Sequence, residues 1–143
     1  MHAAPSPTPR AARRWSKRPA WIRGIEHRIE AHSLGLRDLT TSESTKAAAL
    51  AAGVDKGPID IAEVHAQFSH EELILAEALG LNGKTSINPS GGALASNPVM
   101  SAGLIRIGEV ARRISSGEAN RGVAHAASGP CLQQNMVVVL EGE

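Results

Sequence analysis

Apolar and polar residues follow two different periods along most of the chain. Short apolar or β-branched runs predict strands at residues 20–29, 59–64, 123–127 and 136–140. The last run is almost purely aliphatic, which is typical of a strand buried on both faces. Gly129-Pro130 indicates a turn between the last two strands.

Amphipathic segments between these runs predict helices. Residues 42–52 are rich in alanine and end at Gly53, a residue type that is common just after a helix. A second helix is predicted to open at Ser69, with Glu72 at the spacing of a capping box, and to close at Gly80.

Within this second helix, Phe68 and Leu73 occupy the positions of a hydrophobic staple. Leu75 and Leu79 are four residues apart and therefore share one helix face, which predicts that this face is buried. Residues 82–98 follow and are rich in turn-forming residues.

A third helix is predicted to start at Asn97-Pro98, because asparagine favours the N-cap and proline the first helical position. Its apolar stripe contains Leu104, Ile107, Ala111 and Ile114, and its polar face contains Arg106, Glu109 and Arg113. The alternation of strands and helices predicts an α/β fold, a mixed β-sheet with helices on both faces.

The chain of 143 residues suits one domain, which we assign to residues 19–143. Residues 1–18 contain five basic residues, no acidic residue and several prolines, and we expect a disordered basic arm there. A transit peptide is the alternative, but prolines disfavour its amphipathic helix.

Composition excludes several classes of function. The net charge of +1 and the aromatic content of 2% do not point to nucleic acid as a partner. The single cysteine excludes an internal disulfide framework and fits a cytoplasmic location. No apolar run is long enough to span a membrane.

Two histidines are candidates for chemistry. His65 lies where a predicted strand meets a capped helix, and ligands of open α/β sheets bind beyond the carboxyl ends of strands. His125 and the glycine-rich loop at Asn88–Gly92 could reach the same edge. A structural role is the simpler alternative for each of them. Cys131 is expected to be a small core residue, and no spacing of ligands predicts a metal site.

Four motifs then follow one another in order: Glu63-Val64-His65-Ala66-Gln67-Phe68, Asn88-Pro89-Ser90-Gly91-Gly92, Asn97-Pro98 and His125-Ala126-Ala127-Ser128-Gly129-Pro130. Together they resemble the C-terminal half of a thiolase, closest to the sterol-carrier-protein or lipid-transfer-protein type. The resemblance extends from about residue 19 to the end of the chain. It implies a thiolase-like C-terminal domain that acts on acyl-CoA thioesters in lipid or sterol metabolism.

The resemblance also assigns roles to residues. His65 and Asn97 are expected to hold the thioester oxygen, and His125 is expected to move a proton. Gly91, Gly92, Ala127 and Gly129 are expected to contact substrate. Asn97 replaces the histidine of the family's Gly-His-Pro motif, so it can donate a hydrogen bond but cannot activate a thiol as a base.

Cys131 matches neither of the family's cysteines, so we expect the nucleophilic thiolate to come from a separate thiolase N-terminal half, with a homo-oligomer as the other expected partner. No cofactor is expected beyond the coenzyme A of the substrate. The alternatives are a non-catalytic binding or assembly subunit and a truncated relic of a thiolase.

Overall fold

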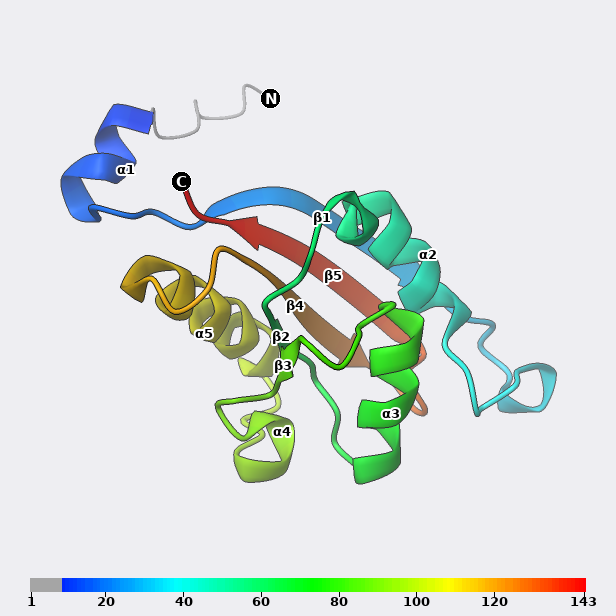
Figure 1. Cartoon of the computed structure of the whole chain (residues 1–143). Coiled ribbons are helices and arrows are strands. Elements are labelled where there is room, and N and C mark those ends of the chain that lie inside the picture. The colour runs from blue at the N-terminus through cyan, green and yellow to red at the C-terminus, as the bar shows by residue number, and fades with distance from the viewer. Residues whose placement is uncertain (1–8) are drawn as a thin grey trace, which may run out of the picture.

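The computed structural model describes residues 9–143 (Figure 1). The strands are β1 (Trp21–Ile29), β2 (Ile61–Glu63), β3 (Ser86–Ile87), β4 (Arg121–Ser128) and β5 (Gln134–Glu141). The helices are α1 (Pro9–Trp15), α2 (Glu43–Ala52), α3 (Ser69–Ala78), α4 (Gly92–Ala95) and α5 (Ala102–Ser116). Short 3-10 helices cover Leu34–Leu36 and Val54–Lys56.

The disordered basic arm expected at residues 1–18 is covered only in part by the described residues. Residues 1–8 lie outside the described part of the chain, and residues from Pro9 to Trp15 form the helix α1. Arg13 of this helix pairs with Glu143 at the other end of the chain, at 2.6 Å. Within residues 9–143, no helix is both long and apolar enough to cross a membrane.

The sheet has five strands in the order β1-β5-β4-β2-β3. β5 is antiparallel to both of its neighbours, β1 and β4. β2 is parallel to β4 and to β3, so the sheet is mixed, as predicted. Figure 1 shows β1 at one edge of the sheet, beside β5.

Helices cover both faces of the sheet, which confirms the predicted α/β architecture. Val137 and Val139 of β5 pack on one face in the same cluster as α2 and α3 residues. Val138 and Leu140 point to the opposite face and pack with α5. All four side chains are buried, so the aliphatic run forms the predicted strand with two covered faces.

The start of α3 differs in one residue from the predicted capping box. The Glu71 carboxylate, not that of Glu72, accepts hydrogen bonds from the backbone N–H groups of Gln67 (2.7 Å) and Phe68 (3.3 Å). The helix begins at Ser69, so Glu71 occupies the position from which a side chain can reach back to these donors. Glu72 instead accepts a hydrogen bond from Asn88 Nδ2.

The burial of apolar side chains in and around α3 follows the prediction only in part. Leu75 and Leu79 are buried in the core, as their spacing indicates. Phe68 and Leu73 remain exposed, so the expected hydrophobic staple does not bury either side chain. Residues 82–98, predicted as turns only, also contain the short elements β3 and α4.

The predicted start of α5 was wrong, and its predicted apolar stripe is confirmed only in part. The helix begins at Ala102 and not at Asn97-Pro98, because the Asn97 side chain bonds across the fold to His65. Its buried line consists of Ala102, Arg106, Val110 and Ile114. Of the predicted stripe, Ile114 is buried and Ile107 and Ala111 pack against the core, whereas Leu104 is 73% exposed. The helix is therefore rotated relative to the predicted apolar stripe.

The buried Arg106 explains this rotation. Its NH1 lies 3.0 Å from Glu63 Oε2 at the end of β2, and both side chains are almost fully buried. The backbone N–H of Ser90 (3.0 Å) and its hydroxyl (2.7 Å) also donate to the Glu63 carboxylate. A buried carboxylate requires such partners, so α5 turns its arginine toward the sheet.

We predict that Arg106→Met destabilises the protein by about 3–5 kcal/mol, because it leaves the buried Glu63 carboxylate without its counter-charge. The measurement is the free energy of unfolding in urea.

The matched control is Arg112→Met on the same helix, since Arg112 is half-exposed and pairs with Glu109 at the surface. This control is expected to change the free energy of unfolding by less than about 0.5 kcal/mol. Adding Glu63→Gln to Arg106→Met should recover part of the loss. Equal effects of the two arginine substitutions would contradict the structural role given to Arg106.

Candidate functional site

The candidate site lies where the carboxyl ends of two parallel strands meet. His65 follows the end of β2 by two residues, and Ala127 is next to the last residue of β4. β2 and β4 are hydrogen-bonded neighbours that run in the same direction. The topology therefore brings residues 62 positions apart to one edge of the sheet, as is usual for ligand sites in open α/β sheets.

The ring of His65 is held on both sides. His65 Nδ1 lies 3.2 Å from the backbone nitrogen of Ala127 and 3.1 Å from the carbonyl oxygen of the same residue. His65 Nε2 lies 2.9 Å from Asn97 Oδ1. An amide oxygen can only accept, so Nε2 carries a proton and donates to Asn97 Oδ1. In the tautomer with its proton on Nε2, Nδ1 accepts from the Ala127 N–H.

This arrangement decides which groups remain available to a ligand. The Asn97 oxygen is used by His65, which orients the Asn97 amide so that its two N–H bonds are the free donors. The Ala127 N–H, expected to bind a thioester oxygen, is used by His65. Asn97 is therefore the donor of this group, and His65 positions it.

A hollow of about 100 Å³ lies beside His65. The hollow is lined by His65, Ala127, Gly129 and Cys131, among others. Asn97 contacts His65 but does not itself line this hollow. Gly91 and Gly92 do not line it either. They belong to the turn into α4, where Gly91 (φ 92°) and Gly92 (φ 61°) adopt left-handed backbone conformations.

His125 is close to the site but enclosed. It lies on β4 and is fully buried. Its Nε2 lies 3.0 Å from Asn135 Oδ1, and Asn135 Nδ2 in turn donates to Ser44 Oγ and to the Leu132 carbonyl, each at 2.7 Å. Within residues 9–143, His125 Nδ1 has no hydrogen-bond partner.

Burial also controls the charge of His125. Desolvation lowers the pKa of its imidazole to about 4, against the effect of the Asn135 hydrogen bond, and the nearby His65 lowers it further. His125 is therefore neutral at physiological pH. A neutral imidazole can accept a proton, but one with this pKa is a weak base at pH 7.

Cys131 does not belong to the core, contrary to the prediction. Its side chain is exposed at the turn between β4 and β5. Cys131 (φ 53°) and Leu132 (φ 55°) both adopt left-handed backbone conformations, which let this tight turn connect the two strands. Arg37 donates to the carbonyl oxygens of Pro130 and Cys131 and holds the turn from outside.

Sequence analysis missed two polar residues that support the site. Asn135 orients His125 and is the last of three consecutive amide residues, Gln133-Gln134-Asn135, that precede the aliphatic run. Glu63 carries the signal of a carboxylate within a buried strand. In the described part of the chain, no three His, Cys, Asp or Glu side chains gather in a group that could hold a metal ion.

Comparison of the sequence with protein-family models and with curated proteins gives no match. The geometry of the site therefore carries the functional argument.

We predict that folding stability falls as the pH drops from about 6.5 to about 4. The folded state excludes a proton that the unfolded chain binds at His125, so the loss at low pH is up to about 3 kcal/mol. The measurement is the free energy of unfolding at several pH values for the wild type and His125→Gln. The variant keeps a donor for Asn135 but has no titrating group there.

The free energies of unfolding of the wild type and of His125→Gln are compared at each pH. The difference between them should change by about 3 kcal/mol between pH 7 and pH 4. His27→Gln on the exposed part of β1 is the matched control and should show no such pH dependence. A difference that is constant with pH would show that His125 titrates normally.

Proposed function

We propose that the chain is a thiolase-like C-terminal domain that binds acyl-CoA thioesters and takes part in acyl transfer or cleavage. The observation that carries the proposal is the contact of Asn97 with His65, which lines a hollow at the carboxyl ends of β2 and β4. It leaves the Asn97 amide as a fixed donor that can face a thioester oxygen.

In this mechanism Asn97 donates a hydrogen bond to the oxygen on which negative charge develops. A single donor of this kind is worth on the order of 10²–10³ in rate when it is preorganised. His65 acts through Asn97: it holds the amide oxygen and receives the Ala127 N–H on its other side. Because both nitrogens of the His65 ring are held by hydrogen bonds, the ring can keep the Asn97 amide in one orientation. This supports a positioning role for His65 and a donor role for Asn97.

We assign the proton transfer to His125 in an assembled complex. The described part of the chain encloses His125, so this role requires a partner that opens the β4 end or contributes to it. The partner proposed is a separate thiolase N-terminal half that supplies the nucleophilic thiolate. Coenzyme A enters only as part of the substrate, and the proposed location is the cytoplasm.

A second candidate function is that of a non-catalytic assembly subunit. The observation that favours it is a row of exposed isoleucines on β1, Ile22, Ile25 and Ile29, each more than half exposed. The register pairs Ile22 with Leu140 and Ile25 with Val138, so these side chains lie on the face of the sheet that α5 covers elsewhere. An uncovered apolar sheet face of this kind is typical of an interface.

Light scattering on the purified chain and on Ile25→Lys separates the two candidates. An assembly subunit is expected to be larger than 14.9 kDa in solution and to lose that association in the variant. Asn97→Ala should leave such an association unchanged.

The thioester proposal predicts that the chain alone binds acetoacetyl-CoA but does not cleave it. Asn97→Ala is expected to weaken binding about three- to tenfold, the equivalent of about one hydrogen bond. Titration calorimetry measures the affinity, and the loss of acetoacetyl-CoA in the presence of coenzyme A measures cleavage.

Asn82→Ala is the matched control, because the Asn82 side chain accepts from the Lys84 N–H in a surface turn, whereas that of Asn97 accepts from His65. Its affinity for acetoacetyl-CoA should equal that of the wild type. Turnover by the chain without a partner would refute the proposed dependence on an external thiolate. Equal affinity of Asn97→Ala and wild type would refute the role of Asn97.

A further inference from the structure

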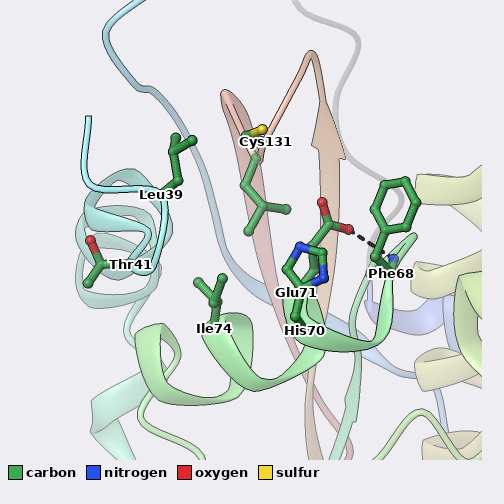
Figure 2. A pocket seen from close by; sticks show the side chains of 8 residues that line it. Leu39, Thr41, Phe68, His70, Glu71, Ile74 and Cys131 are labelled. Atoms are coloured by element: carbon green, nitrogen blue, oxygen red, sulfur yellow. Dashed lines mark hydrogen bonds between the residues drawn. The ribbon is translucent and has the colours of Figure 1, made fainter. Parts of the chain in front are cut away.

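A larger cavity, of about 310 Å³, adjoins the hollow at His65 (Figure 2). Phe68, Glu71, Cys131 and Leu132 line both spaces, so the cavity belongs to the site already described. The surface that this site leaves unused lies at the edge of the sheet, along β1. In the part of the chain that the structure describes, β1 pairs with β5 on one side and with no strand on the other (Figure 1).

The outer edge of β1 presents backbone groups that can bind another strand. The Glu30 N–H donates to the carbonyl oxygen of Gln133 at 2.7 Å, so Glu30 directs its backbone groups toward β5. These directions alternate from residue to residue along an antiparallel strand. Ile25, His27 and Ile29 therefore turn their N–H and C=O groups to the outer edge. Such an unpaired row is a template for a strand of another chain.

The sequence Ile25-Glu26-His27-Arg28-Ile29 is complementary to itself when it is read in the opposite direction. A two-fold axis at His27 places this residue opposite His27 of a second copy. Ile25 of each copy then lies opposite Ile29 of the other, and Glu26 opposite Arg28. This register also brings outward N–H groups opposite outward C=O groups, so the side chains and the backbone favour the same pairing.

The side chains of this segment are accessible to a partner. Ile25 is 56% exposed and Ile29 is 59% exposed. Ile25 lies beside Val138 and on the side of the sheet that α5 covers elsewhere, so in a two-fold pair four isoleucines form one apolar cluster there. Glu26 and Arg28 share the opposite side and form an ion pair within the strand at 2.6 Å. Across the axis, this ion pair becomes a network of four charges.

A β-bulge limits the pairing to this segment. Between Ile22 and Gly24, β1 gains one residue relative to β5. A bulge increases the local twist and bends the strand, so it turns the start of the edge away from a flat partner. Ile22 therefore lies outside the pairing. A long, flat edge would invite aggregation, whereas a short edge with charges favours a defined dimer.

We propose that β1 binds β1 of a second copy of this chain, antiparallel and in register around His27, and thereby joins two five-stranded sheets into one. The inference rests on the assembly role considered above, for which it names the partner, and it is independent of the thioester role of Asn97. Backbone hydrogen bonds supply the affinity, and the opposite charges of Glu26 and Arg28 fix the register.

Disulfide cross-linking tests the register, with every variant made in a Cys131→Ser background to remove the single native cysteine. His27→Cys should form a disulfide between two copies under mild oxidation, because opposite residues of a hydrogen-bonded pair have Cα atoms about 5.5 Å apart. Ile29→Cys is the matched control, since the two copies of Ile29 lie more than about 13 Å apart along the strands. It should cross-link only when it is mixed with Ile25→Cys. Gel electrophoresis without reductant measures the cross-linked fraction.

Charge reversal tests the contact between side chains, with Kd of the dimer measured by sedimentation equilibrium. Glu26→Arg places two arginines opposite each other on both sides of the axis and should raise Kd about tenfold or more. The double variant Glu26→Arg with Arg28→Glu exchanges the charges and should return Kd to within about threefold of the wild type. Glu77→Arg is the matched control, since Glu77 is an exposed glutamate on α3, and it should leave Kd unchanged.

The outcomes separate this inference from the assembly role itself. A wild-type chain that stays at 14.9 kDa up to about 1 mM would overturn both. An association that Ile25→Lys abolishes, but that gives no disulfide with His27→Cys, would keep the assembly role and overturn the pairing of β1. A Kd that Glu26→Arg does not raise, or that the double variant does not restore, would overturn the register around His27.

Discussion

The arrangement of the site depends on one buried carboxylate. Glu63 ends β2 without exposure to solvent, and its oxygens are satisfied by Ser90 and by Arg106 of α5. This contact fixes the loop after β3, which continues through α4 to Asn97. The segment from Ser90 to Asn97 is therefore held at one end by Glu63 and at the other by His65, which lies two residues after Glu63. The ion pair thus joins the packing of α5 to the geometry of the site.

The sequence pattern predicts those parts of the fold that depend on interactions between residues close together in the chain. The aliphatic residues 136–140 form a strand covered on both faces, and Gly53 ends α2 in a left-handed conformation, as glycine does. The alternation of elements gave the mixed sheet with helices on both faces. Apolar periodicity failed for α5 because it treats every arginine as exposed, whereas Arg106 is buried against a charge 43 positions away.

Local patterns single out His65 and Asn97 as candidate site residues, but they do not predict the contact between them. His65 was identified from its position between a strand and a helix, and Asn97 from a motif that also suggested a helix cap. Their contact spans 32 positions and follows from the order of strands in the sheet, which no local pattern contains. The enclosure of His125 has the same origin, since Asn135 reaches it from the neighbouring strand.

The turn between β4 and β5 contains two non-glycine residues in the left-handed backbone conformation. Glycine would adopt the left-handed torsions of Cys131 and Leu132 freely, whereas a residue with a Cβ loses about 1–2 kcal/mol there. Both side chains form walls of the hollow and of the larger cavity. Two glycines at these positions would remove the backbone strain of the turn, but they would also remove two side chains from the lining. The turn therefore keeps a backbone strain that glycines would avoid, and its side chains shape the cavity wall.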